Sequence, residues 1–115
     1  WRDMHMDFIK VAETTELEPG GKKMVTLKGI DILITNIEGV YHAVDNRCPH
    51  MGGSLVEGVL EGTHITCPLH GSIFDVVTGE VVKPGKLLFM SVKVHDLRKY
   101  PLKIEGNDLL IAIPE

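Results

Sequence analysis

Residues 48–53 read CPHMGG and residues 67–71 read CPLHG, and these two stretches hold the only two cysteines of the chain. We call them the first and the second ligand loop. Together they give the pattern Cys48-x-His50, sixteen residues, then Cys67-x-x-His70. Thiolate and imidazole are ligands that transition metals prefer in proteins. Two matched Cys/His pairs, each followed by glycine, therefore predict one shared metal centre built from two loops.

The rest of the chain has the composition of an ordinary soluble globular protein. Its length of 115 residues predicts a single domain, 1–115. Hydrophobic residues make up 43% of the chain and charged residues 24%, which is typical of a protein with a buried core. A net charge of −4 argues against a nucleic-acid partner. The apolar runs, such as 87–90, are too short to cross a bilayer, and no secretory signal follows the start. We expect a cytoplasmic monomer that binds neither membrane nor nucleic acid.

Outside the ligand loops, the sequence predicts an all-β fold. Short runs rich in β-branched residues alternate with turn residues, and Lys28-Gly29 and Glu38-Gly39 are placed to close hairpins. The expected strands span residues 8–12, 23–27, 30–37, 40–44, 88–97, 100–104 and 109–113. No segment keeps a helical period, and residues 14–30 have room for one helical turn at most. These features predict an antiparallel β sandwich or barrel base.

The ligand loops lie in a segment of different character, residues 45–86. It contains seven of the twelve glycines of the chain. Glycine enrichment at this level indicates loops and close backbone approaches rather than long regular strands. We therefore expect a loop-rich subdomain inserted into the base, with the ligand loops as its tips.

Two kinds of metal centre fit two thiolates and two imidazoles: a tetrahedral zinc site and a 2Fe-2S cluster. A disulfide is the less favoured alternative for a cytoplasmic chain without a dense cysteine framework. Zinc fingers with these ligands group Cys with Cys and place the His pair on a helix, whereas here Cys and His alternate and no helix is predicted. Gly52, Gly53 and Gly71 would let backbone N–H groups approach anionic sulfides. The pattern favours the cluster.

Both loops and their flanks resemble the Rieske 2Fe-2S family. The likeness is carried by AVDNRCPHMGG (43–53), CPLHGSIFDVVTGEVV (67–82) and the Pro84-Gly85 turn, which stands where that family places a loop over its cluster. It is strong over about residues 40–86 and only a matter of strand pattern elsewhere. The resemblance implies one 2Fe-2S cluster, with Cys48 and Cys67 on one iron and His50 and His70 on the other. Residues 45–86 would then be a cluster-binding subdomain.

Three neighbouring positions indicate the soluble, low-potential branch of that family. The Rieske proteins of respiratory and photosynthetic complexes join their loops by a disulfide, and the equivalent residues here are Gly53 and Leu69. Those proteins also have a tyrosine hydroxyl near a ligand sulfur, where this chain has Phe74. Ser72 is retained at the position whose hydroxyl binds a bridging sulfide. Because hydrogen bonds to sulfur stabilise the reduced cluster, their loss implies a lower potential.

Apolar residues beside the ligand histidines form a second group of candidates. Met51 and Leu69 would either rim an exposed redox tip for brief docking with a partner or shield the cluster from water. Both roles are compatible with an electron carrier.

The expected function is therefore one-electron transfer, from a reductase to an acceptor such as a ring-hydroxylating oxygenase. One alternative is the small Rieske-like subunit of an assimilatory nitrite reductase, and another is a structural zinc module. We expect no catalysis by the chain itself, because an oxygenase needs a mononuclear iron site on a further domain and the sequence shows no nucleophile–base pair or phosphate-binding glycine loop.

Overall fold

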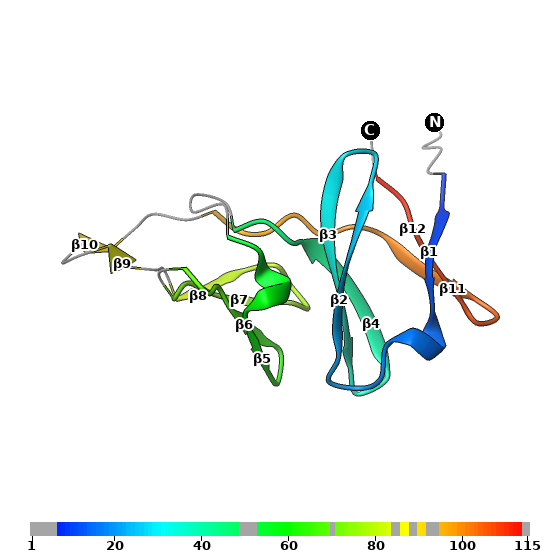
Figure 1. Ribbon diagram of the computed structural model, residues 1–115, viewed down its shortest axis with the longest axis horizontal. Coiled ribbons are helices and arrows are strands. Elements are labelled where there is room, and N and C mark those ends of the chain that lie inside the picture. The colour runs from blue at the N-terminus through cyan, green and yellow to red at the C-terminus, as the bar shows by residue number, and fades with distance from the viewer. Residues whose placement is uncertain are drawn as a thin grey trace.

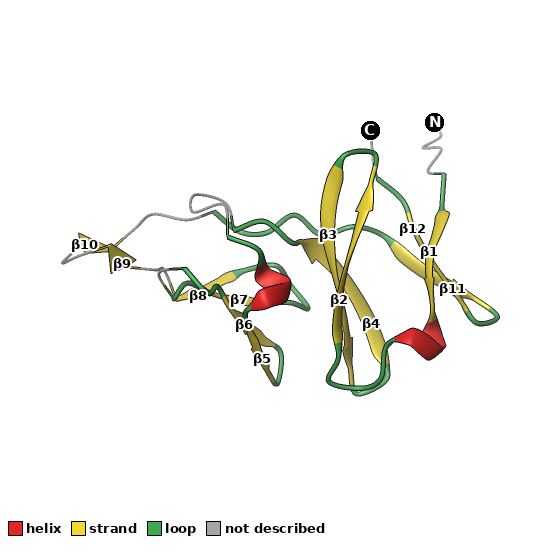
Figure 2. Cartoon of the chain, viewed as in Figure 1, coloured by secondary structure: helices red, strands yellow, loops and turns green. Residues whose placement is uncertain are grey.

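A computed structural model describes residues 7–48, 53–69, 71–83, 86–87, 90–91 and 95–113, and this part of the chain is nearly all antiparallel β structure (Figures 1 and 2). The strands are β1 (Ile9–Glu13), β2 (Lys22–Leu27), β3 (Ile30–Ile37), β4 (Val40–Asp45), β5 (Val59–Glu61), β6 (His64–Thr66), β7 (Ile73–Asp75), β8 (Val81–Lys83), β9 (Lys86–Leu87), β10 (Met90–Ser91), β11 (Leu102–Glu105) and β12 (Asp108–Ile111). The helical turns within this part are the 3-10 turns η1 (Thr14–Glu16) and η2 (Leu55–Glu57). The predicted all-β class is confirmed.

The base consists of two three-stranded sheets, β2-β3-β4 and β1-β12-β11. In the first sheet β3 pairs along its length with β2 and β4. Both predicted hairpin turns are confirmed, because Lys28 and Gly29 have φ of 53° and 79° and Glu38 and Gly39 have φ of 53° and 93°. Positive φ at both central residues is the geometry whose twist matches antiparallel strands. No helix in the described ranges is long and apolar enough to span a membrane.

Strand β3 is buried on both of its faces and separates two hydrophobic cores. Ile32 and Ile34 point into the base core, where they pack with Ala43 of β4. Leu33 points to the opposite face and packs in a second core, with Val44 of β4. Because side chains alternate along a strand, one sheet supplies a wall to each core. The second core belongs mainly to residues 45–86.

Residues 45–86 contain the four-stranded sheet β5-β6-β7-β8, which lies at the opposite end of the molecule from β1-β12-β11 (Figure 1). The sequence correctly predicted turns in this segment, but it did not predict the four short strands β5 to β8. Each has three residues, which is too short for an alternating pattern to be recognised. The glycines serve the tight turns, as Gly62 and Gly79 do with φ of 61° and 83°. A Cβ on Gly58 would lie 1.9 Å from the Thr66 carbonyl oxygen.

The chain enters and leaves this subdomain along two adjacent segments. The Asp45 N–H donates to the Arg98 carbonyl (3.0 Å) and the Tyr100 N–H donates to the Ala43 carbonyl (3.0 Å). A single bridge between Val44 and Lys99 lies between these bonds. The outgoing and returning segments therefore form one stem between base and subdomain, visible in Figure 1.

The predicted strand over 88–97 is not continuous where the structure describes it. Only β10 is a strand there, residues 95–97 are not, and 88–89 and 92–94 lie outside the described residues. The Asp96 carboxylate accepts a hydrogen bond from the Val81 N–H (2.9 Å), and the Leu97 N–H donates to the Gly79 carbonyl (2.7 Å). At residues 96–97 side-chain and turn contacts replace a regular ladder, so the predicted strand does not extend to its expected end at residue 97.

Candidate metal centre

The two cysteines lie in the core of the subdomain. Cys48 is 0% exposed and Cys67 is 1% exposed, and both pack in the core that contains Leu55, Ile65 and Phe74. They come from segments nineteen positions apart in the sequence. The fold therefore places the cysteines of both ligand loops in one core.

The first ligand loop is closed by a short antiparallel ladder. Arg47 and Ser54 form a bridge, the Cys48 N–H donates to the Gly53 carbonyl (2.9 Å), and the Leu55 N–H donates to the Asn46 carbonyl (2.8 Å). These bonds hold both ends of the loop. The loop itself, residues 49–52 with the predicted ligand His50 and with Met51, lies outside the described residues.

The second ligand loop is closed in a similar way between β6 and β7. The Cys67 N–H donates to the Ser72 carbonyl (2.7 Å), and Gly71 has φ of 77°, a conformation that favours glycine. The predicted ligand His70 lies outside the described residues, as does Pro84. In both loops the N–H of the cysteine is therefore bonded to a carbonyl on the far side of the loop.

The two ligand loops touch at Gly53. A Cβ built on this glycine would lie 2.9 Å from Cys67 Sγ and 3.2 Å from the Cγ and Cδ1 of Leu69. Gly53 and Leu69 are the positions that the sequence comparison equated with an inter-loop disulfide. Here a glycine faces the Leu69 side chain, which is 46% exposed. Any side chain at position 53 would displace one of its two neighbours.

The surroundings of Ser72 indicate whether this site can hold a group that contains sulfide. The residue is fully buried, and its Oγ has no hydrogen-bond partner among the described residues. A buried hydroxyl without a partner costs about 1–3 kcal/mol, so such groups normally face an acceptor. A sulfide or thiolate is such an acceptor, and Ser72 lies in the loop that follows Cys67. Phe74 is buried in the same core and offers no hydroxyl. The residues present therefore fit a 2Fe-2S cluster.

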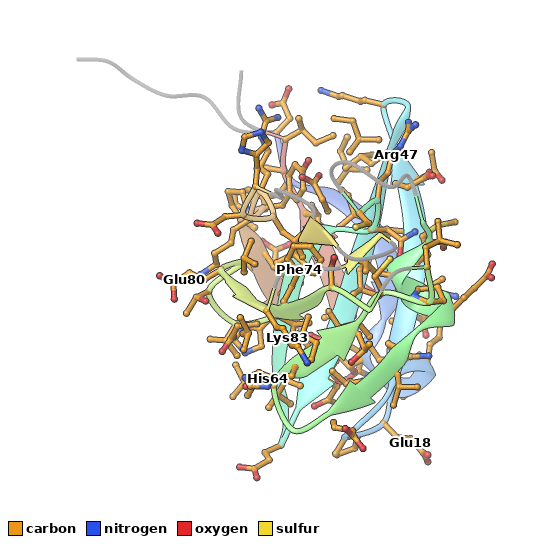
Figure 3. All side chains as sticks on the ribbon, turned by 90° about the vertical axis from the view of Figure 1, so that its left-hand side faces the viewer. Glu18, Arg47, His64, Phe74, Glu80 and Lys83 are labelled. Atoms are coloured by element: carbon orange, nitrogen blue, oxygen red, sulfur yellow. The ribbon has the colours of Figure 1, made fainter. Side chains whose placement is uncertain are left out.

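Within the described part of the chain, no three Cys, His, Asp or Glu side chains form a group that could hold a metal ion. The two cysteines there account for two of the four predicted ligands. Figure 3 looks at the end of the molecule that carries β9 and β10, with Arg47 on one side and His64, Lys83 and Glu80 on the other.

The stem contains a polar junction that the sequence did not predict. The Tyr100 hydroxyl donates to Asp45 Oδ1 (2.5 Å), and the Arg98 N–H donates to Asp45 Oδ2 (3.1 Å). Burial, together with the neighbouring Asp45 carboxylate, raises the pKa of Tyr100 to about 12. These residues are far apart in the sequence, so no local pattern indicated that they meet.

Comparisons with known proteins place this geometry in context. A family model described as the Rieske [2Fe-2S] domain matches residues 7–99. The ferredoxin component of the naphthalene 1,2-dioxygenase system of Pseudomonas aeruginosa is 34% identical over 98 residues, which cover 85% of this chain and 88% of that protein.

Solved structures show the same likeness in three dimensions. The ferredoxin of carbazole 1,9a-dioxygenase from Nocardioides aromaticivorans IC177 matches with a TM-score of 0.78 and 27% identity, over 91% of this chain and 96% of that chain. A chain from the complex of reduced oxygenase and oxidized ferredoxin in carbazole 1,9a-dioxygenase matches with a TM-score of 0.79 and 25% identity, over 91% and 92%. The likeness extends over nearly the whole length of each protein.

Proposed function

Because this chain belongs to the Rieske 2Fe-2S domain family, we propose that it is a one-electron carrier whose cluster is bound by Cys48, His50, Cys67 and His70. When bound, a cluster of this kind takes up one electron and gives it back. The observation that carries the proposal is the contact of the two ligand loops, with Gly53 of the first against Cys67 of the second. This contact supports a single centre shared by both loops.

The chain's own residues would hold the cluster in two ways. The thiolates of Cys48 and Cys67 would bind it from within the subdomain core, and the imidazoles of His50 and His70 would bind it from the loop tips. The buried Ser72 hydroxyl would donate a hydrogen bond to a cluster sulfur, which supplies the partner that its Oγ otherwise lacks. Leu69 and the surrounding apolar core would exclude water from the Cys67 side.

The same residues support a low reduction potential. Phe74 is buried with no hydroxyl to donate to a ligand sulfur, which leaves Ser72 as the side-chain donor that the described residues offer. The Gly53–Leu69 contact is apolar and uncharged. Fewer donors to sulfur stabilise the reduced state less, so the potential falls.

The partners are proposed from the proteins that this chain resembles. The relative from Pseudomonas aeruginosa is the ferredoxin component of a dioxygenase system, and one structural match is a complex of ferredoxin with oxygenase. We therefore assign a reductase as electron donor and a terminal oxygenase as acceptor, in the cytoplasm. These names favour a freestanding ferredoxin over the small subunit of a nitrite reductase. The chain would transfer electrons and leave the chemistry to its partner.

Spectroscopy of the isolated protein tests the proposal. The protein is reduced anaerobically and examined by EPR, and iron, sulfide and zinc are assayed on the same sample. We expect a rhombic Rieske-type signal, with iron and sulfide in equal amounts and negligible zinc. Stoichiometric zinc with no EPR signal after iron–sulfur reconstitution would overturn the proposal and favour a structural zinc module. Reduction by an oxygenase reductase and NADH then tests the assigned donor.

A further inference from the structure

Asn46 is a buried polar residue two positions before Cys48. It is 2% exposed, and its amide group has three hydrogen bonds. The Nδ2 group donates to Ser54 Oγ (2.9 Å) and to Met24 Sδ (3.3 Å), while Oδ1 accepts from the Val56 N–H (2.8 Å). A buried amide with partners on both its donor and acceptor sides is held in one orientation.

The backbone of Asn46 adds two further connections. Its N–H donates to the Asp31 carbonyl of β3 (3.0 Å), and its carbonyl accepts from the Leu55 N–H of η2 (2.8 Å). The base sheet and η2 are also joined directly, because Lys22 Nζ of β2 donates to the Val56 carbonyl of η2 (2.7 Å). Asn46 therefore connects the base sheet with both ends of the first ligand loop.

We propose that Asn46 is the positioning residue of the metal centre: it fixes the first ligand loop, and with it Cys48, against the base sheet. This inference rests on the function proposed above. The side chain of Asn46 does not need to touch the cluster. It acts through Ser54 and Val56, which follow the ladder bond between Cys48 and Gly53. Without these bonds the loop can shift on the base while the base stays folded.

The chain offers a matched control in Asn36. This residue is also 2% exposed, its Nδ2 donates to the Leu17 carbonyl (2.9 Å), and its Oδ1 accepts from the Gly39 N–H (2.8 Å). It lies on β3, but its partners belong to the base and not to a ligand loop. The two asparagines thus have the same chemistry and burial and differ in what they hold.

The experiment compares Asn46→Ala with Asn36→Ala in the cluster-loaded protein. Loss of cluster absorbance in the presence of an iron chelator, the EPR g-values after reduction, and chemical unfolding are measured for each. Both variants should lose stability, because each removes a buried amide that is hydrogen-bonded on its donor and its acceptor side. Only Asn46→Ala should release the cluster faster, by about tenfold or more, and shift the g-values.

A conservative variant separates positioning from general stability. In Asn46→Asp the carboxylate still accepts from the Val56 N–H, and it accepts from the Ser54 hydroxyl instead of donating to it. Slow cluster loss should therefore be restored. The added negative charge should make the reduction potential more negative than in the wild type, since it opposes uptake of an electron.

The outcomes distinguish this inference from the proposed function. If the wild type lacks a Rieske-type signal, the proposed function fails. If the wild type has the signal and Asn46→Ala matches Asn36→Ala in cluster loss and g-values, the positioning role is wrong. If Asn46→Ala does not fold, Ser54→Ala serves as a milder variant, because it removes only the hydrogen bond from Asn46 Nδ2 to Ser54 Oγ. A wild-type rate of cluster loss and unchanged g-values in that variant would also overturn the inference.

Discussion

The base and the subdomain of residues 45–86 share the β2-β3-β4 sheet as a wall, yet each is stabilised in a different way. The base strands in this sheet run for six to eight residues with unbroken pairing, and they close through regular two-residue turns. Strands β5 to β8 have three residues each, and the register shifts between β7 and β8. The hydrophobic cluster of the base is built from aliphatic residues and Tyr100, whereas that of the subdomain contains both cysteines.

This difference indicates what each region needs in order to fold. Long hairpins over an apolar core are self-sufficient, because hydrogen bonds and burial are supplied by the same strands. Three-residue strands are too short to be stable by themselves. The shared wall supports them, and the proposed cluster would add stability by tying the two ligand loops together, since metal binding free energy becomes folding free energy. The predictions below test that division.

Loss of a ligand should produce the largest effect. His70→Ser should lose the cluster, and amides of β5 to β8 should then exchange hydrogen rapidly while those of β3 stay protected. The exposed His64 on β6 provides the control, and His64→Ser should keep its iron. Iron assay and hydrogen exchange by mass spectrometry measure both. Full iron and an unchanged spectrum in His70→Ser would show that the ligand assignment is wrong.

Adjacent residues of β3 allow the two cores to be probed separately. Leu33 and Ile34 are both fully buried, but Leu33 packs in the subdomain core and Ile34 in the base core. Each change to alanine should destabilise the protein by about 2–5 kcal/mol in chemical unfolding. Leu33→Ala should also accelerate cluster loss, because its cavity opens in the core that contains both cysteines. Equal cluster retention in both variants would mean that the two cores are not energetically separate.

Glycine substitutions test the contact between the loops. In Gly53→Ala the new Cβ would lie 2.9 Å from Cys67 Sγ, so the sulfur or Leu69 must move. We expect a stability loss of about 1–3 kcal/mol and an altered visible spectrum. Gly21→Ala introduces a similarly close contact, 2.9 Å from the Glu18 carbonyl oxygen, but within the base. It should destabilise the protein without changing the spectrum, and a normal spectrum in both variants would argue against the inter-loop contact.

The stem should give the smallest effect, and it depends on pH. The pKa of Tyr100 is raised to about 12 in the folded state, so folding favours the protonated phenol. This stabilisation is complete below about pH 10, the ordinary tyrosine value, and is lost as the pH rises from about 10 to about 12. Solvent screening limits it to the order of 1 kcal/mol.

Comparison with Tyr100→Phe isolates this contribution. The variant lacks the hydroxyl that donates to Asp45, so its free energy of unfolding should fall less between pH 10 and 12 than that of the wild type. Other groups that titrate in this range contribute to both proteins and cancel in the difference. Parallel curves for the two proteins would contradict the assignment.

Much of the base could be predicted because its information is local. Lys28-Gly29 and Glu38-Gly39 mark turns between runs of β-branched residues, and the structure has hairpins at both places. The residues 88–97 show the limit of such patterns. Alternation there predicted a strand, but the carboxylate of Asp96 bonds to the β8 backbone instead, and a tertiary contact of this kind has no local signature.

For the proposed centre, the sequence by itself determined which side chains are available: two Cys/His pairs at short spacing, with glycines after them, in loops that resemble a 2Fe-2S family. Ligands can be proposed from sequence because the capacity to bind a metal depends on the side chains themselves. Only the tertiary structure decided how the loops meet. The approach of Gly53 to Cys67, the buried hydroxyl of Ser72 and the anchoring of Asn46 between β2, β3 and η2 all join segments distant in the chain. Such contacts follow from packing in three dimensions, which residue spacing does not encode.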